Sequence, residues 1–96
     1  MLSAEPINLK NVKKEEIDKE ILRLGIIAEL DAVSLYEQLA AMARTSGIKK
    51  VLAQIAKEEK THVGEFHTLL LALDKEQKQE MEEGKREVTE LLSERK

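Results

Sequence analysis

Apolar residues recur every three or four positions along two long stretches of the chain, which is the spacing of amphipathic helices. The first stretch begins near Lys13 and ends near residue 45, and the second covers about residues 48–73. Between them lies Thr45-Ser46-Gly47, in which the glycine suits the position after a helix end and the serine suits the cap of the next helix. The pattern predicts helices over about 13–45 and 48–73, joined by a short turn into an antiparallel hairpin.

The two ends of the chain follow other patterns. Residues 1–12 contain the only proline, Pro6, and show no clear periodicity, so we expect an irregular arm. The stretch after Leu73 is almost all polar, and its thin apolar stripe predicts a shorter third helix over about 76–95 that bends at Gly84. The length of 96 residues allows one domain, which we expect over 13–96.

The first long helix is apolar on more than one side. A second apolar set lies roughly a quarter-turn from its main stripe and consists of Leu22, Gly25, Val33 and Ala40. A hairpin closes on itself with one apolar stripe per helix, so the second set needs another partner. A chain this short without cysteine also gains from association. We therefore expect an all-α fold in which two hairpins from two copies form a four-helix bundle with two-fold symmetry.

Composition and charge exclude several classes of protein. Aromatic residues are only 2% of the chain, and the dominance of Ala, Leu, Glu, Lys and Ile is typical of long helices and not of a β-sandwich. The net charge of −3 leaves no basic surface for nucleic acid. The sequence has no apolar run of about 20 residues to span a membrane and no signal peptide. We expect a cytoplasmic protein that binds neither nucleic acid nor membrane.

Three polar residues interrupt these apolar stripes. The main stripe of the second helix consists of Ile48, Leu52, Ile55, Glu59, His62, Phe66, Leu69/Leu70 and Leu73. Burying Glu59 and His62 there costs several kcal/mol unless they find partners. On the first helix, Glu29 interrupts an apolar row in the same way.

The three interrupting residues should meet in the hairpin. Glu29 lies about 17 residues before the turn and Glu59 about 13 after it, so their heights match within roughly 6 Å. Glu-x-x-His places a carboxylate and an imidazole on one helix face, and di-iron bundles combine two such pairs with a Glu from each of two other helices. This chain carries half of that set, so two copies would complete it. Glu29, Glu59 and His62 are therefore the predicted metal ligands.

Other readings of these residues remain open. A Glu29–His62 pair could fix the register of a purely structural bundle. Glu65 is expected to be mostly exposed to solvent. Its alternative role is a weak contact with the metal. Asp31 belongs to a solvated helix face, or to a secondary cation site. Tyr36 is either a core residue or a residue beside the site whose hydroxyl pairs with a carboxylate.

Two segments carry a family resemblance. Glu29 is followed seven residues later by Tyr36, and EEKTHVGEF runs from Glu58 to Phe66. Together they resemble the encapsulated ferritins, a branch of the ferritin-like superfamily whose members are two-helix half-ferritins with a shorter third helix. The similarity covers roughly residues 10–95. Rubrerythrins share the broader ligand pattern, but they carry both halves in one chain.

The resemblance implies a specific activity and assembly. It implies a di-iron ferroxidase centre between two chains, with two iron ions per dimer held by Glu29, Glu59 and His62, and with Tyr36 nearby. It also implies an open ring, typically of ten chains. Such rings work inside an encapsulin shell, where Fe(II) is oxidised so that Fe(III) mineral is stored in the lumen. The expected location is therefore an encapsulin nanocompartment in the cytoplasm.

The sequence also departs from this family. Relatives often carry further carboxylates and a tryptophan around the first-helix ligand, whereas Ala28, Asp31 and Leu35 stand here, so a route for iron into the centre would depend on Asp31. Residues 90–96 do not match a shell-docking peptide, so the chain is either a domain fused to a shell protein or a chain with a divergent tail. A rubrerythrin-like or di-manganese bundle that consumes peroxide would use the same ligands, and a structural or adaptor helical bundle would keep a buried Glu–His pair without metal.

Overall fold

The computed structural model describes residues 9–93, so residues 1–8 of the expected arm and residues 94–96 lie outside the described part. Two short 3₁₀ turns, Leu9–Asn11 and Lys14–Glu16, precede three α-helices. The helices are α1, Ile17–Met42; α2, Ser46–Leu73; and α3, Lys75–Ser93. The described residues contain no strand, so the all-α prediction of a hairpin followed by a shorter helix is confirmed.

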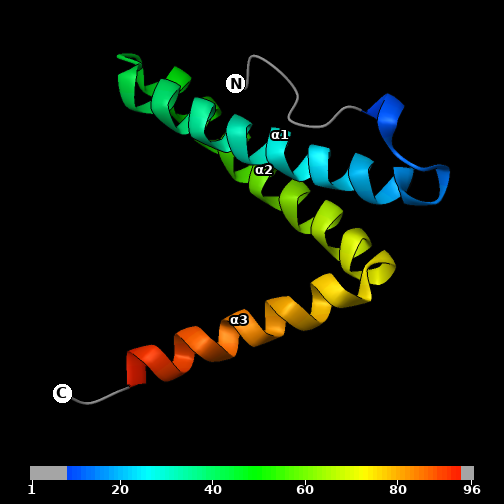
Figure 1. The fold of residues 1–96 in the computed structure, drawn as a ribbon. Coiled ribbons are helices and arrows are strands. Elements are labelled where there is room, and N and C mark those ends of the chain that lie inside the picture. Colours follow the sequence, from blue (N-terminus) through cyan, green and yellow to red (C-terminus); the bar gives the residue numbers. More distant parts are fainter. Residues whose placement is uncertain (1–8, 94–96) are drawn as a thin grey trace.

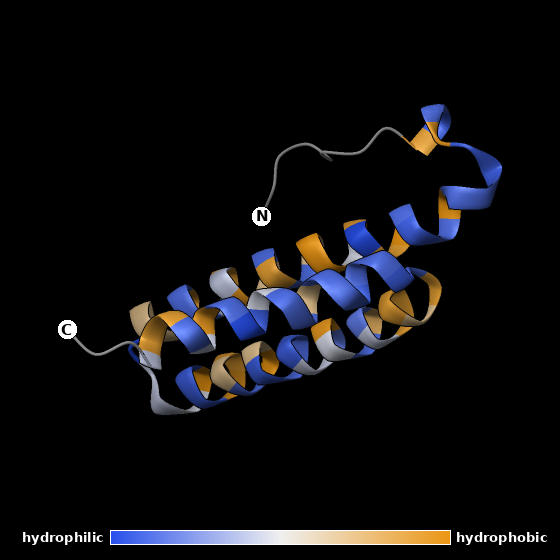
Figure 2. Ribbon diagram, turned by 60° about the horizontal axis from the view of Figure 1, so that its bottom comes forward, coloured by the Kyte–Doolittle hydropathy of each residue, from blue (hydrophilic) through white to orange (hydrophobic). Residues whose placement is uncertain are grey.

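Helices α1 and α2 lie side by side and antiparallel (Figure 1). Hydrophobic and hydrophilic residues alternate along all three helices, as expected of amphipathic helices (Figure 2). The buried hydrophobic residues among those described are Leu22 and Ala32 on α1 and Ala56 and Leu70 on α2. The core is therefore a narrow seam between the two long helices, and two of its four members are alanines that let the helices approach closely.

The turn between the long helices differs from the predicted one. Helix α1 ends at Met42 and α2 begins at Ser46, so Ser46 and Gly47 belong to the first turn of α2. No described residue has a positive φ, and Ala43 leaves α1 in an extended conformation. The expected glycine after the helix end and the expected serine cap are therefore wrong.

A lysine explains why no left-handed residue is needed at this turn. Lys49 Nζ donates hydrogen bonds to the carbonyl oxygens of Ala40 at 2.9 Å and Ala41 at 3.2 Å. These carbonyls are among the last four of α1, which lack partners within the helix. The side chain supplies the hydrogen bonds that a glycine cap would otherwise provide from the backbone.

Asp74 connects α2 to α3 and fixes the start of α3. Its Oδ1 accepts a hydrogen bond from the Gln77 backbone N–H at 2.9 Å, which caps the helix, and its Oδ2 accepts one from Arg23 at 2.9 Å. The Gln77 N–H is the main reason that the pKa of Asp74 is lowered; Lys19 and Arg23 act in the same direction and burial opposes them. Helix α3 then runs without interruption through Gly84, so the predicted bend there is wrong.

The chain has an open shape. Helix α3 leads away from the hairpin at an angle (Figure 1), and the radius of gyration is 17.2 Å, whereas a compact domain of this length has about 12 Å. Large apolar side chains are exposed on all three helices, including Leu30 at 52%, Val51 at 59% and Leu92 at 78%. No helix within residues 9–93 is both long enough and apolar enough to cross a membrane.

Candidate metal centre

Glu29 from α1 and Glu59 and His62 from α2 meet in the middle of the hairpin. Each residue offers one ligand atom, and these atoms all lie within 4.8 Å of one another. His62 Nδ1 lies 3.5 Å from Glu29 Oε2 and 3.7 Å from Glu59 Oε1. The structure thus brings together the three residues that the sequence pattern selected, and they form the one such group of three or more among the described residues.

Local helix geometry produces this cluster. Glu59 and His62 are three residues apart, so α2 presents them on one face. Glu29 reaches them from the antiparallel α1. The Glu29 and Glu59 side chains are 20% and 19% exposed, whereas His62 is 44% exposed. The carboxylates therefore lie within the hairpin seam while the imidazole faces one open side of it.

One carboxylate oxygen of this cluster is buried without a hydrogen bond. Glu29 Oε2 is buried and has no hydrogen-bond partner, and it is the only such side-chain atom among residues 9–93. Its nearest cationic group, His62 Nδ1 at 3.5 Å, lies beyond the distance of about 2.7–2.9 Å of a charge-assisted hydrogen bond. A buried carboxylate oxygen without a donor is costly. A bound cation would satisfy it, so the donor set fits a metal ion.

The charges of the cluster act on one another. The pKa of Glu29 is raised, chiefly because a proton on its carboxyl group can be shared with Glu59, and further because of burial and the Glu59 charge; His62 opposes this. Burial works against protonation of His62, but the carboxylates of Glu29, Glu59 and Glu65 outweigh it and raise the His62 pKa. Because both pKa values are raised, a divalent cation would compete with protons for this group.

The remaining predicted site residues lie outside the cluster. Glu65 is exposed and acts on the centre through its charge on His62. Asp31 is half-buried on α1 and does not join the group of three. Tyr36 is half-buried, and within the described residues its hydroxyl makes no hydrogen bond, so a carboxylate partner from the same chain is absent there.

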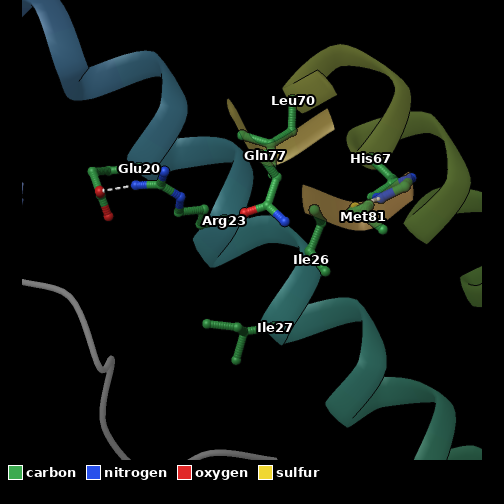
Figure 3. A pocket seen from close by; sticks show the side chains of 8 residues that line it. All are labelled: Glu20, Arg23, Ile26, Ile27, His67, Leu70, Gln77 and Met81. Atoms are coloured by element: carbon green, nitrogen blue, oxygen red, sulfur yellow. Dashed lines mark hydrogen bonds and ion pairs between the residues drawn. The ribbon is translucent and has the colours of Figure 1, made fainter. Parts of the chain in front are cut away.

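A separate pocket of about 530 Å³ lies between the hairpin and the start of α3 (Figure 3). Ile26 and Ile27 of α1 and Leu70 of α2 form its apolar lining, and His67 Nε2 lies 2.9 Å from Met81 Sδ. None of the three candidate ligands lines it. The sequence pattern gave no sign of the Arg23–Asp74 ion pair, which joins residues 51 positions apart.

Comparisons with known proteins identify relatives of this chain. A sequence model of the rubrerythrin family matches residues 20–95. A curated relative from Pyrococcus furiosus, described as a ferritin-like-encapsulin shell fusion protein, is 52% identical over 94 residues. That alignment covers 95% of this chain and 27% of the relative, so the chain spans about a quarter of the fusion protein.

A solved structure extends the comparison to the fold. The crystal structure of the encapsulated ferritin domain from Pyrococcus furiosus matches with a TM-score of 0.82 and 48% sequence identity, over 100% of both chains. Ferritin-like and rubrerythrin proteins generally bind iron, and the findings support an iron-related function of the ferritin-like kind. The chain belongs to the rubrerythrin family, whose sequence model it matches, and to the encapsulated ferritins that its sequence resembles.

Proposed function

We propose that the chain is a ferroxidase that binds Fe(II) between two copies and oxidises it to Fe(III) with dioxygen. The observation that carries the proposal is the cluster of Glu29, Glu59 and His62, in which one buried carboxylate oxygen accepts no hydrogen bond. Carboxylate oxygens with an imidazole nitrogen form the mixed ligand set that suits iron. Fe(II) is the substrate, and each ion gives one electron to dioxygen.

The incomplete ligand set supports a second copy. One chain supplies two carboxylates and one imidazole, which is half of the di-iron set. The half-exposed His62 lies on the face of the hairpin where large apolar side chains are also uncovered: Ile21 and Leu39 of α1 and Val51, Leu69 and Leu73 of α2. Ile21, Leu69 and Leu73 line one shallow groove there. Pairing two such faces would bury the apolar residues and bring two half-sets together.

The side chains of this chain have distinct tasks in the proposed reaction. Glu59, from the middle of the seam, would hold the ions together with Glu29 and His62, the carboxylates offering oxygen ligands and the imidazole a nitrogen ligand. His62 must present an unprotonated nitrogen and Glu29 an ionised carboxylate, so Fe(II) binding releases protons from the cluster. The apolar residues around the cluster limit the access of water once the faces are paired.

A shell-associated role follows from the relative and not from the cluster. The fusion protein from Pyrococcus furiosus joins a ferritin-like part to an encapsulin shell. By analogy, we propose that this chain works inside an encapsulin compartment in the cytoplasm, where Fe(III) is stored. Assembly of dimers into an open ring, as the family resemblance implies, belongs to the same proposal.

Aerobic titration of Fe(II) into the purified protein tests the activity. We expect near-UV Fe(III) absorbance to saturate at about one oxidised ion per chain, and the Glu29→Ala, Glu59→Ala and His62→Ala variants to lose this phase. Glu58→Gln is the matched control, because Glu58 neighbours Glu59 but is exposed and outside the cluster. Oxidation no faster than in buffer, with variants that assemble normally, would reduce the cluster to a structural one.

Two alternatives use the same residues. The rubrerythrin-family match favours peroxide as a competing oxidant, so faster turnover of the Fe(II)-loaded protein with peroxide than with dioxygen would support that activity. The Glu29–His62 distance of 3.5 Å favours a structural ion pair. That reading requires stability and assembly that do not respond to metal.

A further inference from the structure

Phe66 of α2 lies directly against Gly25 of α1, next to the candidate ligands. A Cβ atom added to Gly25 would lie 3.3 Å from both Cδ2 and Cε2 of the Phe66 ring. Ordinary carbon contacts are about 3.5–4.0 Å, so glycine is the residue that accommodates the ring at this separation.

This contact occupies the layer beside the metal cluster. Gly25 precedes Glu29 by four residues, and Phe66 follows His62 by four residues. In an antiparallel hairpin the two pairs are therefore neighbouring layers, one helical turn apart, or about 6 Å along the axis. Whatever fixes the separation of α1 and α2 at Gly25 also acts on the separation between Glu29 and His62.

We propose that the Phe66–Gly25 contact sets the spacing of α1 and α2 at the metal centre, so that both are positioning residues for Glu29 and His62. The inference rests on the proposed function, because it assigns them a role in metal binding. A glycine in the interior of a helix is destabilising relative to alanine. The close approach of the Phe66 ring explains why glycine is kept at position 25 in spite of this cost. The other glycines in residues 9–93 have no such contact, since a Cβ atom on Gly47, Gly64 or Gly84 would meet nothing within 4 Å.

Two distances give the expected sensitivity. The Gly25→Ala substitution would force the ring or the helix to move by a few tenths of an ångström. Metal–ligand distances tolerate about 0.2 Å. A displacement of this size, one turn from the ligands, should weaken metal binding about tenfold, the low end of the effect of residues that orient ligands.

Gly64→Ala is the matched control. Gly64 lies inside α2, is exposed, and has open space around an added Cβ. Both substitutions raise helix propensity by the same amount, so a difference between them reports the contact with the ring. Phe66→Leu removes the ring from the other side, and the Gly25→Ala/Phe66→Leu double variant tests whether the two residues act through one another.

The experiment titrates Co²⁺ into the full chain and follows its visible absorption, which reports both affinity and ligand geometry. We expect Gly25→Ala to bind Co²⁺ about tenfold more weakly with a shifted spectrum, Gly64→Ala to match the wild type, and the double variant to regain most of the loss. Circular dichroism and particle mass should stay unchanged in all variants.

The possible outcomes separate this role from the proposed function. Wild-type affinity and spectrum in Gly25→Ala would overturn the positioning role and leave the metal site intact. A wild-type chain that binds Co²⁺ no better than a Glu29→Gln variant would overturn both. If Gly25→Ala loses helix content, Phe66→Leu decides, because an unchanged affinity and spectrum there would refute the positioning role and a change would support it.

Discussion

Without metal, the Glu29→Gln variant should be more stable than the wild type. With metal bound, the variant should be less stable than the wild type. The ligand atoms of Glu29 and Glu59 lie within 4.8 Å, and both side chains are about four-fifths buried. At an effective dielectric constant of about 20, two carboxylates at that distance repel by about 3.5 kcal/mol. His62 and solvent offset part of this, so we expect Glu29→Gln to gain about 1 kcal/mol.

The pH dependence has a definite sign. Because the folded-state pKa of Glu29 is raised, folding favours the protonated carboxyl. That contribution is complete below the ordinary value of 4.5 and is lost as the pH rises through the raised value. At pH 8 the ionised Glu29 therefore opposes folding. The advantage of Glu29→Gln should shrink as the pH falls towards 4.5.

The assay is thermal unfolding at one protein concentration, with chelator or with excess Mn²⁺, which does not turn over. A gain of 1 kcal/mol raises Tm by about 4–8 °C in a domain of this size. Mn²⁺ at 100 times its Kd should stabilise the wild type by about 2.7 kcal/mol and the variant far less, which inverts their order. Glu58→Gln should change neither the Tm in chelator nor the stabilisation by Mn²⁺. A Glu29→Gln variant less stable than wild type in chelator would refute the argument and favour a structural Glu29–His62 pair.

Two further predictions concern the scaffold. Leu70 is only 4% exposed, so Leu70→Ala should lower the free energy of unfolding by about 2–4 kcal/mol, measured by urea denaturation; a loss under about 1 kcal/mol would contradict its place in the core. Asp74 has a lowered pKa, so its contribution is present above its ordinary value of 3.8 and is lost as the pH falls through the folded value. The Tm difference between wild type and Asp74→Asn, which keeps a capping oxygen for Gln77, should therefore disappear in acid, and a difference that persists there would contradict the charge argument.

The candidate ligands could be found from the sequence because two signals coincide on them. Glu59 and His62 stand at apolar positions of a regular stripe, and Glu29 has a matching height on the other arm of the hairpin. Periodicity and helix rise depend on local geometry alone, so they survive in the structure. Whether these residues bind metal stays a prediction, since the same pattern also describes a buried ion pair.

Contacts between distant residues were beyond the sequence pattern. The predicted turn at Gly47 is wrong because the Lys49 side chain donates hydrogen bonds to two of the last carbonyl groups of α1. The Arg23–Asp74 pair and the Phe66–Gly25 contact each join residues more than 40 positions apart. Local periodicity does not predict such contacts, because they depend on the register in which two helices pack.

If two copies pair as proposed, the narrow seam of buried residues makes the stability of the fold depend on protein concentration. Four buried side chains are a small core for residues 9–93, so the proposed pairing with a second copy would supply much of the stability. For a protein that folds as it dimerises, each tenfold dilution removes about 1.4 kcal/mol per dimer. Copies tethered to one shell would experience effective concentrations in the millimolar range. The high local concentration inside the shell would then favour the folded state. The domain would lose order when it is released and diluted.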